Sequence, residues 1–288
     1  MGSGGETAGG IAAQRYSPRP LTDGERWTAE ALAQLRRRRY RPAAWIAFLA
    51  GSLERSRASR SQRPALARQA GAWGLAGGAA WCATCVAARH RADLDPPFIA
   101  GLAWWLVVWR MLDWHLGMAE GGDGRPRSRL SPADAVTLAR FWLVPALPAA
   151  ARAGAPLPAV IALGAATDWL DGTLARRTGR TRLGRDLDTT ADLAFLTTAA
   201  VSARRAGRLP GLGFAALAGR HGIGLIVALV AVFGRARRPA IRARPWGAPL
   251  RFGGLALCTL NRPRVGTGLL IAGCLVPPRS TAPSLSPA

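Results

Sequence analysis

The sequence predicts an all-α fold, a polytopic bundle of membrane helices. Hydrophobic residues make up 49% of the 288-residue chain, and the mean hydropathy is +0.10 although 39 basic side chains lower that average. The apolar residues are gathered in runs that, with their flanking turns, reach or approach the ~20 residues that a membrane span needs. A soluble helical bundle with an alanine-rich core is the alternative that this pattern leaves open.

About eight apolar runs are separated by short, arginine-rich loops. We expect membrane helices over residues 70–88, 98–118, 135–150, 157–167, 193–203, 211–234, 246–260 and 265–278. Several of the 11 tryptophans lie beside the ends of these runs, which is typical of side chains at the membrane interface.

The runs divide the chain into four parts. Residues 1–69 form a basic, amphipathic region that is cytoplasmic or interfacial, 70–121 hold two extra membrane helices, 122–280 form the main membrane domain, and 281–288 form a tail. The segment from Thr22 to Arg39 begins with a Thr-x-x-Glu capping box and ends in four arginines, which predicts a helix lying on the cytoplasmic leaflet. Residues 43–53 are apolar but too short to span, and we expect them to form a second helix on the same leaflet. A partly disordered basic tail is the alternative for this region.

The charge pattern narrows the class of partner. Every basic residue is arginine, so the chain has no lysine for a Walker-type phosphate loop, a pyridoxal Schiff base or a kinase-type site. The net charge of +23 suits nucleic acid or anionic lipid. Because the arginines are spread over loops between spans, we expect anionic membrane lipids as partners and no nucleic acid.

Arginine placement also predicts the orientation. If both termini are cytoplasmic, the inside loops hold more arginines than the outside loops, as the positive-inside rule requires. The cluster at residues 204–208 lies on the outside and argues the other way. We therefore expect a multi-pass protein of the cell membrane with its termini and active site on the cytoplasmic side.

Four carboxylates stand at the ends of two successive expected helices. Asp168 and Asp171 are three residues apart on one helix, and Asp188 and Asp192 are four apart on the next, so each pair shares a face. A short loop makes the two helices antiparallel and brings the pairs together. Clustered carboxylates require cations, and oxygen ligands select magnesium, manganese or calcium. Two such ions bridged by a carboxylate would suit phosphoryl transfer.

This segment is specific enough to suggest a family. Residues 168–176 read DWLDGTLAR and residues 184–192 read GRDLDTTAD. The run resembles the signature of the CDP-alcohol phosphatidyltransferases, D-x2-D-G-x2-A-R-x8-G-x3-D-x3-D, and carries all eight fixed residues. It departs in having seven residues, not eight, between Arg176 and Gly184.

The resemblance implies a fold and an activity. Family members look like six-helix membrane proteins with the signature on the second and third helices, and a T-x-x-R on the first helix is matched by Thr137 and Arg140. The implied reaction moves a phosphatidyl group from a CDP-linked lipid, such as CDP-diacylglycerol, to an alcohol or phospho-alcohol acceptor. CMP is released, and the product is a phospholipid. The resemblance also suggests a homodimer.

The same resemblance assigns roles to residues. Two divalent ions, Mg2+ or Mn2+, would be bound by Asp168, Asp171 and Asp188. Asp192 would be the general base and a further metal ligand. The CDP site would be formed by Gly172, Arg176, Gly184, Thr137 and Arg140.

The sequence leaves alternatives for two features, the roles of Arg220 and Arg251 and the function as a whole. Arg220, beside His221, and Arg251 either bind a phosphate on the acceptor, or Arg220 pairs with a carboxylate such as Asp192 or extends to the interface. The alternative function is a non-enzymatic protein or transporter that binds divalent ions.

Overall fold

A computed structural model describes residues 23–88, 96–121, 123–154, 156–179, 181–233, 241–242, 246–277 and 279–280. Over these residues the chain forms eleven α-helices, which confirms the all-α class. A short 3-10 helix, Leu116–Met118, follows α5, and two-residue strands β1 (Ile241–Arg242) and β2 (Arg279–Ser280) pair antiparallel. Thr22 of the expected capping box, the expected tail 281–288 and most of the arginine-rich loop 234–245 lie outside the described residues.

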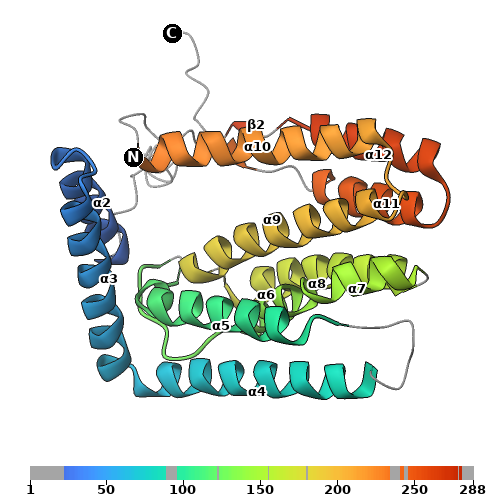
Figure 1. Ribbon diagram of the computed structural model, residues 1–288. Coiled ribbons are helices and arrows are strands. Elements are labelled where there is room, and N and C mark those ends of the chain that lie inside the picture. Colours follow the sequence, from blue (N-terminus) through green and yellow to red (C-terminus); the bar gives the residue numbers. More distant parts are fainter. Residues whose placement is uncertain are drawn as a thin grey trace, which may run out of the picture.

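The helices are labelled in Figure 1. They are α2 (Asp23–Arg37), α3 (Pro42–Gln62), α4 (Pro64–Ala88), α5 (Phe98–His115), α6 (Pro132–Leu143), α7 (Ala146–Ala153), α8 (Pro156–Thr178), α9 (Arg182–Arg205), α10 (Gly211–Phe233), α11 (Gly247–Thr259) and α12 (Pro263–Leu275). Each expected run therefore contains helix, but α8 continues beyond the expected 157–167 to Thr178, and α9 begins at Arg182, well before the expected 193–203.

The run at 135–150 differs from the expectation, because it holds two helices and not one. Helix α6 ends at Leu143 and α7 begins at Ala146. Pro145 stands between them; proline has no N–H to donate, and its ring clashes with the carbonyl four residues earlier, so a helix is interrupted there. The prediction of one continuous helix was wrong, because it weighed apolar length and ignored this residue.

Among the described helices, α10 is long and apolar enough to cross a membrane, with the stretch Gly211–Val230 meeting both requirements. Its apolar side chains are largely exposed, including Ile223 at 63% and Ile226 at 61%. Helix α12 is apolar but shorter. The other expected spans are helices, and their place in a membrane stays a prediction.

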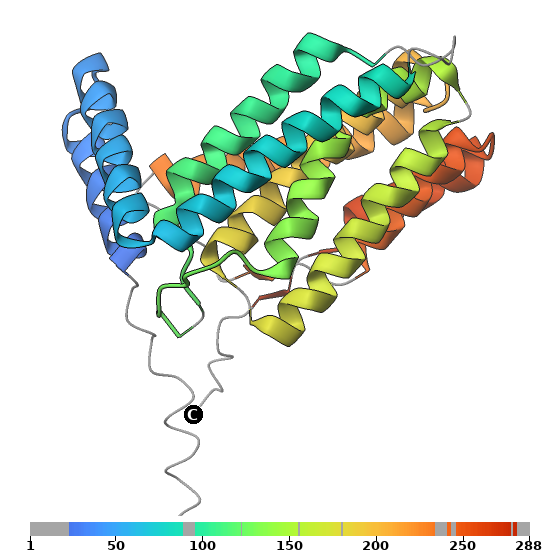
Figure 2. The same cartoon turned by 90° about the horizontal axis from the view of Figure 1, so that it is seen from below.

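The helices pack around two hydrophobic clusters. One lies among α7–α12 and is centred on Phe195 and Phe252, whose rings are 5.8 Å apart. The other joins α4, α5, α6 and the first turns of α9, and includes Leu112, Phe141 and Leu187. Helix α9 contributes to both clusters, so it links the two halves of the bundle (Figure 2).

Hydrogen bonds from tryptophan side chains join α4 to α5 and α5 to α6. Trp105 Nε1 donates to the Gly74 carbonyl at 2.8 Å, which joins α5 to α4. Trp104 Nε1 donates to the Phe141 carbonyl of α6 at 2.8 Å. The two extra N-terminal helices are therefore built into the bundle.

Helices α2 and α3 lie across one end of the bundle (Figures 1 and 2). The backbone N–H of Gly24 donates to Glu120 Oε1 at 3.3 Å, and Glu25 lies 3.8 Å from Arg182 at the start of α9. The backbone N–H of Arg182 in turn donates to the Glu120 carbonyl at 3.0 Å. The N-terminal region thus contacts the loop that joins the two halves of the aspartate-rich segment.

Candidate functional site

The structure brings the predicted carboxylates together. Asp168 and Asp171 lie on α8, and Asp188 lies on α9; one oxygen from each falls within 4.8 Å of the others. Asp171 is buried, whereas the side chain of Asp188 is 45% exposed. Three oxygen donors at this spacing could hold a divalent cation.

The short connection between α8 and α9 keeps the two carboxylate pairs in register. Helix α8 ends at Thr178, and Gly179 has a φ of +85°, a conformation that favours glycine. Thr181 then caps α9 by accepting a hydrogen bond from the Gly184 N–H at 2.9 Å. Thr181 also forms an antiparallel bridge with Gly121. The start of α9 is thus fixed by a cap and a bridge, both made by Thr181.

Arg140 lies at the centre of the carboxylates, and its side chain is fully buried. Its Nη1 is 2.9 Å from Asp188 Oδ1 and 2.5 Å from Asp192 Oδ1. Its Nη2 pairs with Asp171 and lies 3.6 Å from Asp168 Oδ1. One guanidinium therefore faces four carboxylates, and these outnumber it, so a cation would be attracted to the cluster.

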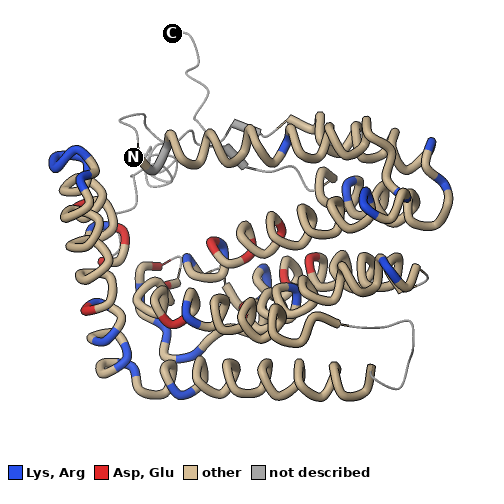
Figure 3. The backbone as a smooth tube through the Cα atoms, viewed as in Figure 1, with Lys and Arg blue, Asp and Glu red and all other residues tan. Residues whose placement is uncertain are grey.

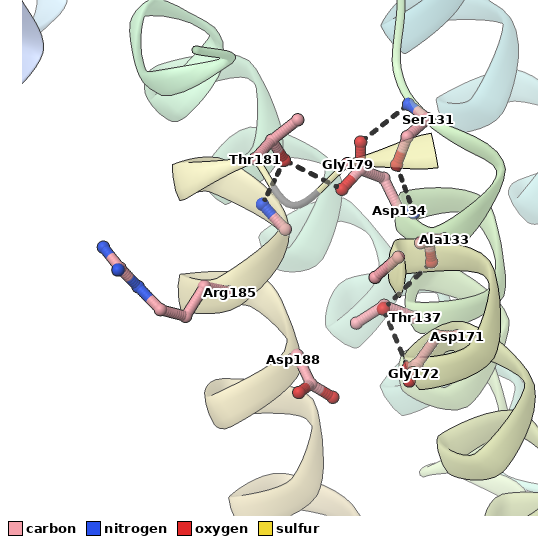
Figure 4. A pocket seen from close by; sticks show the side chains of 12 residues that line it. Ser131, Ala133, Asp134, Thr137, Asp171, Gly172, Gly179, Thr181, Arg185 and Asp188 are labelled. Atoms are coloured by element: carbon pink, nitrogen blue, oxygen red, sulfur yellow. Dashed lines mark hydrogen bonds between the residues drawn. The ribbon is translucent and has the colours of Figure 1, made fainter. Parts of the chain in front are cut away.

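A small pocket of about 90 Å³ opens beside the cluster, between α6, α8 and the start of α9 (Figure 4). Three residues expected at the CDP site line it, namely Thr137, Gly172 and Gly184, together with Asp171 and Asp188. The hydroxyl of Thr137 lies 3.1 Å from Asp171 Oδ2. These residues, far apart in the sequence, share one cavity.

The other two residues expected at the CDP site do not line this pocket. Arg140 is engaged by the carboxylates, as described above. Arg176 is exposed on the last turns of α8, where its Nη2 donates to Thr173 Oγ1 at 2.9 Å. Asp192 also lies outside the group of three clustered ligand oxygens, and its Oδ1 is held by Arg140.

Several residues that line the pocket were not expected from the sequence, among them Ser131 and Asp134. Ser131 Oγ accepts from the Asp134 N–H at 3.2 Å, and Asp134 Oδ2 accepts from the Ser131 N–H at 2.7 Å, which forms a capping box at the start of α6. The spacing Ser-x-x-Asp before an apolar run is the signal that could have found them. A β-carbon at Gly184 would meet Asp134 Oδ1, so this glycine lets α9 approach the box.

Arg251 of α11 lies near the cluster, and Arg220 and His221 of α10 lie near Arg251. Arg251 is close enough to Asp192 and Asp168 to interact with them electrostatically, and its buried Nε has no hydrogen-bond partner among the described residues. His221 Nδ1 lies 3.1 Å from Thr197 Oγ1. No ion pair between Arg220 and Asp192 is present among the described contacts, because Asp192 is paired with Arg140.

Comparison with known proteins places this site in a family. No curated protein and no solved structure matches the chain. The model of the CDP-alcohol phosphatidyltransferase family matches residues 130–277, just over half of the chain, and this range contains α6 to α12 with all four carboxylates. The chain therefore belongs to the CDP-alcohol phosphatidyltransferase family.

Proposed function

We propose that this protein is a membrane-embedded enzyme of phospholipid biosynthesis that moves a phosphatidyl group from CDP-diacylglycerol to an alcohol. The observation that supports this most strongly is the convergence of Asp168, Asp171 and Asp188 within 4.8 Å, inside the range that matches the family. Family membership supports transfer from a CDP-alcohol in general, and the lipid donor is our more specific proposal.

The carboxylate cluster suits two divalent ions, Mg2+ or Mn2+. Asp168, Asp171 and Asp188 offer hard oxygen donors within 4.8 Å, and the four aspartates outnumber the guanidinium between them. We assign these three residues, with Asp192 at the edge of the group, as the ligands. When bound, such ions neutralise the charge of a pyrophosphate.

Asp192 is our candidate for the general base. Its side chain is 24% exposed and lies at the border of the cluster, next to Arg140. In the proposed step, Asp192 takes the hydroxyl proton of the acceptor, and the acceptor oxygen forms a bond to the phosphorus that carries the lipid. The bond between that phosphorus and the oxygen of CMP breaks, and CMP leaves with the electron pair.

The CDP part of the donor would lie along the pocket between α6, α8 and α9. Gly172 and Gly184 both line this pocket. Gly172 has no side chain, so a ligand can approach α8 closely there, whereas the space beside Gly184 is filled by Asp134 and Thr181. Thr137 offers a hydroxyl to the same space. We assign Arg176 to the phosphates, since guanidinium groups pair with phosphate oxygens in a fork geometry. Arg140 is fully buried among the four aspartates, so we assign it to holding these carboxylates in place.

For the acceptor, we favour an alcohol that itself carries a phosphate. The unpartnered, buried Nε of Arg251 supports this choice, because an anion would satisfy it. Arg220 lies near Arg251 and adds positive charge.

Replacing Arg251 by glutamine should raise KM for a phosphorylated acceptor about 10- to 100-fold, as the loss of a charge-assisted contact predicts. KM for CDP-diacylglycerol should stay unchanged, and an equal rise in both constants would contradict the assignment.

The membrane placement is supported by the exposed apolar face of α10 and by the position of α2 and α3. These two helices lie across the end of the bundle, and α3 exposes Trp45, Ile46 and Leu49. Together with the arginines of 36–39, this surface suits an anionic cytoplasmic leaflet. We propose a multi-pass protein with its active site and termini on the cytoplasmic side, and a homodimer as its assembly.

The decisive test is CMP release from CDP-diacylglycerol by the purified full chain with magnesium or manganese, across a panel of alcohols. We expect a lipid product with one acceptor class. Absence of product with every alcohol, from protein that is folded, would overturn the enzyme assignment and leave the ion-binding alternative.

A variant sharpens this test. Asp192→Asn should abolish transfer and retain donor binding, since the amide cannot accept the proton. Asp186→Asn is the matched control, because Asp186 is a half-exposed acid on the same helix outside the signature. Wild-type activity in Asp192→Asn would remove its role as base.

A further inference from the structure

A second, larger pocket lies at the opposite end of the bundle from the carboxylates. It forms where α7 and α9 end, and its volume is about 610 Å³. Arg205 in its wall stands several turns beyond Asp192 on α9, which is about 20 Å at the helical rise of 1.5 Å per residue. Figure 1 shows α7 and the last turns of α9 on the same side of the molecule. The two pockets are therefore separate sites.

This second pocket is strongly basic. Arg152 of α7, Arg205 at the end of α9 and Arg208 just after it all line the cavity. Hydroxyl groups from α9 complete the polar lining, from Thr197, Thr198 and Ser202. No carboxylate lines the pocket, and at this end of the described chain Figure 3 shows basic residues without acidic ones.

One of the arginines is held in place by the backbone. Arg208 Nη1 donates to the Gly154 carbonyl at 3.0 Å and to the Thr259 carbonyl at 3.2 Å. Gly207, with a φ of +70°, turns the chain so that the Arg208 N–H bonds back to the Ala203 carbonyl at 2.9 Å. The guanidinium is thus fixed on a rigid frame before any ligand arrives.

The chemistry of the lining selects a phosphate. Guanidinium groups pair with phosphate oxygens, and serine and threonine hydroxyls donate to the oxygens that remain. The cavity also has apolar walls, formed by Pro148, Ala151 and Val201. It borders α10, since Thr197 in its wall contacts His221 of that helix, and the first turns of α10 expose Leu212 at 65%. Acyl chains could lie along this apolar surface.

We propose that this pocket binds the phosphate headgroup of an anionic phospholipid in the leaflet opposite the active site. The inference rests on the proposed membrane placement of the chain. A lipid-binding role would explain why arginines occur at 204–208. On the proposed orientation this loop lies outside the cytoplasm, where the positive-inside rule predicts few arginines.

The test is equilibrium binding of dioleoylphosphatidylglycerol to the purified full chain in detergent, in EDTA so that no divalent ion recruits lipid to the carboxylates. Dioleoylphosphatidylcholine and inorganic phosphate serve as comparison ligands. We expect the double variant Arg152→Gln/Arg205→Gln to bind phosphatidylglycerol about 10- to 30-fold more weakly, as expected for the loss of two arginines near a lipid phosphate. Both side chains are exposed, so the variant should fold.

The matched control is Arg262→Gln/Arg264→Gln, which removes the same charge from exposed residues outside the pocket. It should bind as the wild type does. Equal losses in the two double variants would show a diffuse charge effect and overturn the site, as would unchanged affinity in the first. Tighter or equal binding of inorganic phosphate would overturn the lipid assignment. Asp192→Asn should bind phosphatidylglycerol normally, so failure of the enzyme assignment and failure of this site are separable.

Discussion

Replacing Arg140 by glutamine should destabilise the protein in the absence of divalent ions. The guanidinium is fully buried and forms ion pairs with all four aspartates, so its removal leaves clustered carboxylates without their central counter-charge. Removing one partner of a buried ion pair typically costs about 3–5 kcal/mol. At about 2–4 °C per kcal/mol for a chain of this size class, the melting temperature should fall by roughly 6–20 °C.

Thermal unfolding in detergent, monitored by intrinsic tryptophan fluorescence, measures this effect. In EDTA the Arg140→Gln variant should melt below the wild type by that amount. Magnesium or manganese should then raise the melting temperature of the variant more than that of the wild type, because the ions replace the lost positive charge. A ligand at 100 times its Kd adds about 2.7 kcal/mol, which is large enough to detect.

The control for this experiment is Arg176→Gln, since Arg176 is exposed and its hydrogen bond is to Thr173 of its own helix. That variant should melt within about 1–2 °C of the wild type, as most surface substitutions do. Identical melting temperatures for wild type and Arg140→Gln in EDTA would refute the reasoning that Arg140 neutralises the cluster.

Three further experiments test residues that hold the helices around the site in place. Gly184→Ala should destabilise by about 1–3 kcal/mol in thermal unfolding, because its β-carbon would lie 2.5 Å from Asp134 Oδ1; an unchanged melting temperature would mean that α9 can shift freely. Ser131→Ala should cost about 1 kcal/mol by the same measurement through loss of the cap on α6, with Ser131→Thr as the variant that restores it. A double-mutant cycle of Glu25→Gln and Arg182→Gln should give a coupling of about 0.5–3 kcal/mol, since both side chains are largely buried and their charged atoms are 3.8 Å apart; a coupling near zero would contradict the contact.

The helices and the carboxylate cluster could be predicted from the sequence for physical reasons. Apolar runs between arginine-rich loops leave few alternatives to helix, and each expected run is helical over most of its length. The spacings of Asp168 with Asp171 and of Asp188 with Asp192 are helical, and a loop as short as 179–181 forces the two helices to be antiparallel neighbours. Local periodicity was therefore sufficient for these features.

The position of Arg140 could not be predicted in this way. Its four partners lie 28 to 52 residues further along the chain, so their approach depends on how α6 packs against α8 and α9. The length of α3 was also underestimated, because its last third is polar and carries no apolar periodicity. The break at Pro145 and the capping box of Ser131 and Asp134 had local signals in the sequence.

The supported turn between α8 and α9 has an evolutionary consequence. Thr181 is bonded forward to Gly184 and sideways to Gly121, and the neighbouring Glu120 is itself bonded to Gly24 of the N-terminal region. These contacts tie the N-terminal helices to the start of α9, so an insertion between Thr181 and Gly184 would disturb both, whereas one before Thr181 would leave the contacts intact. Differences in the length of this connection among relatives should therefore fall before Thr181.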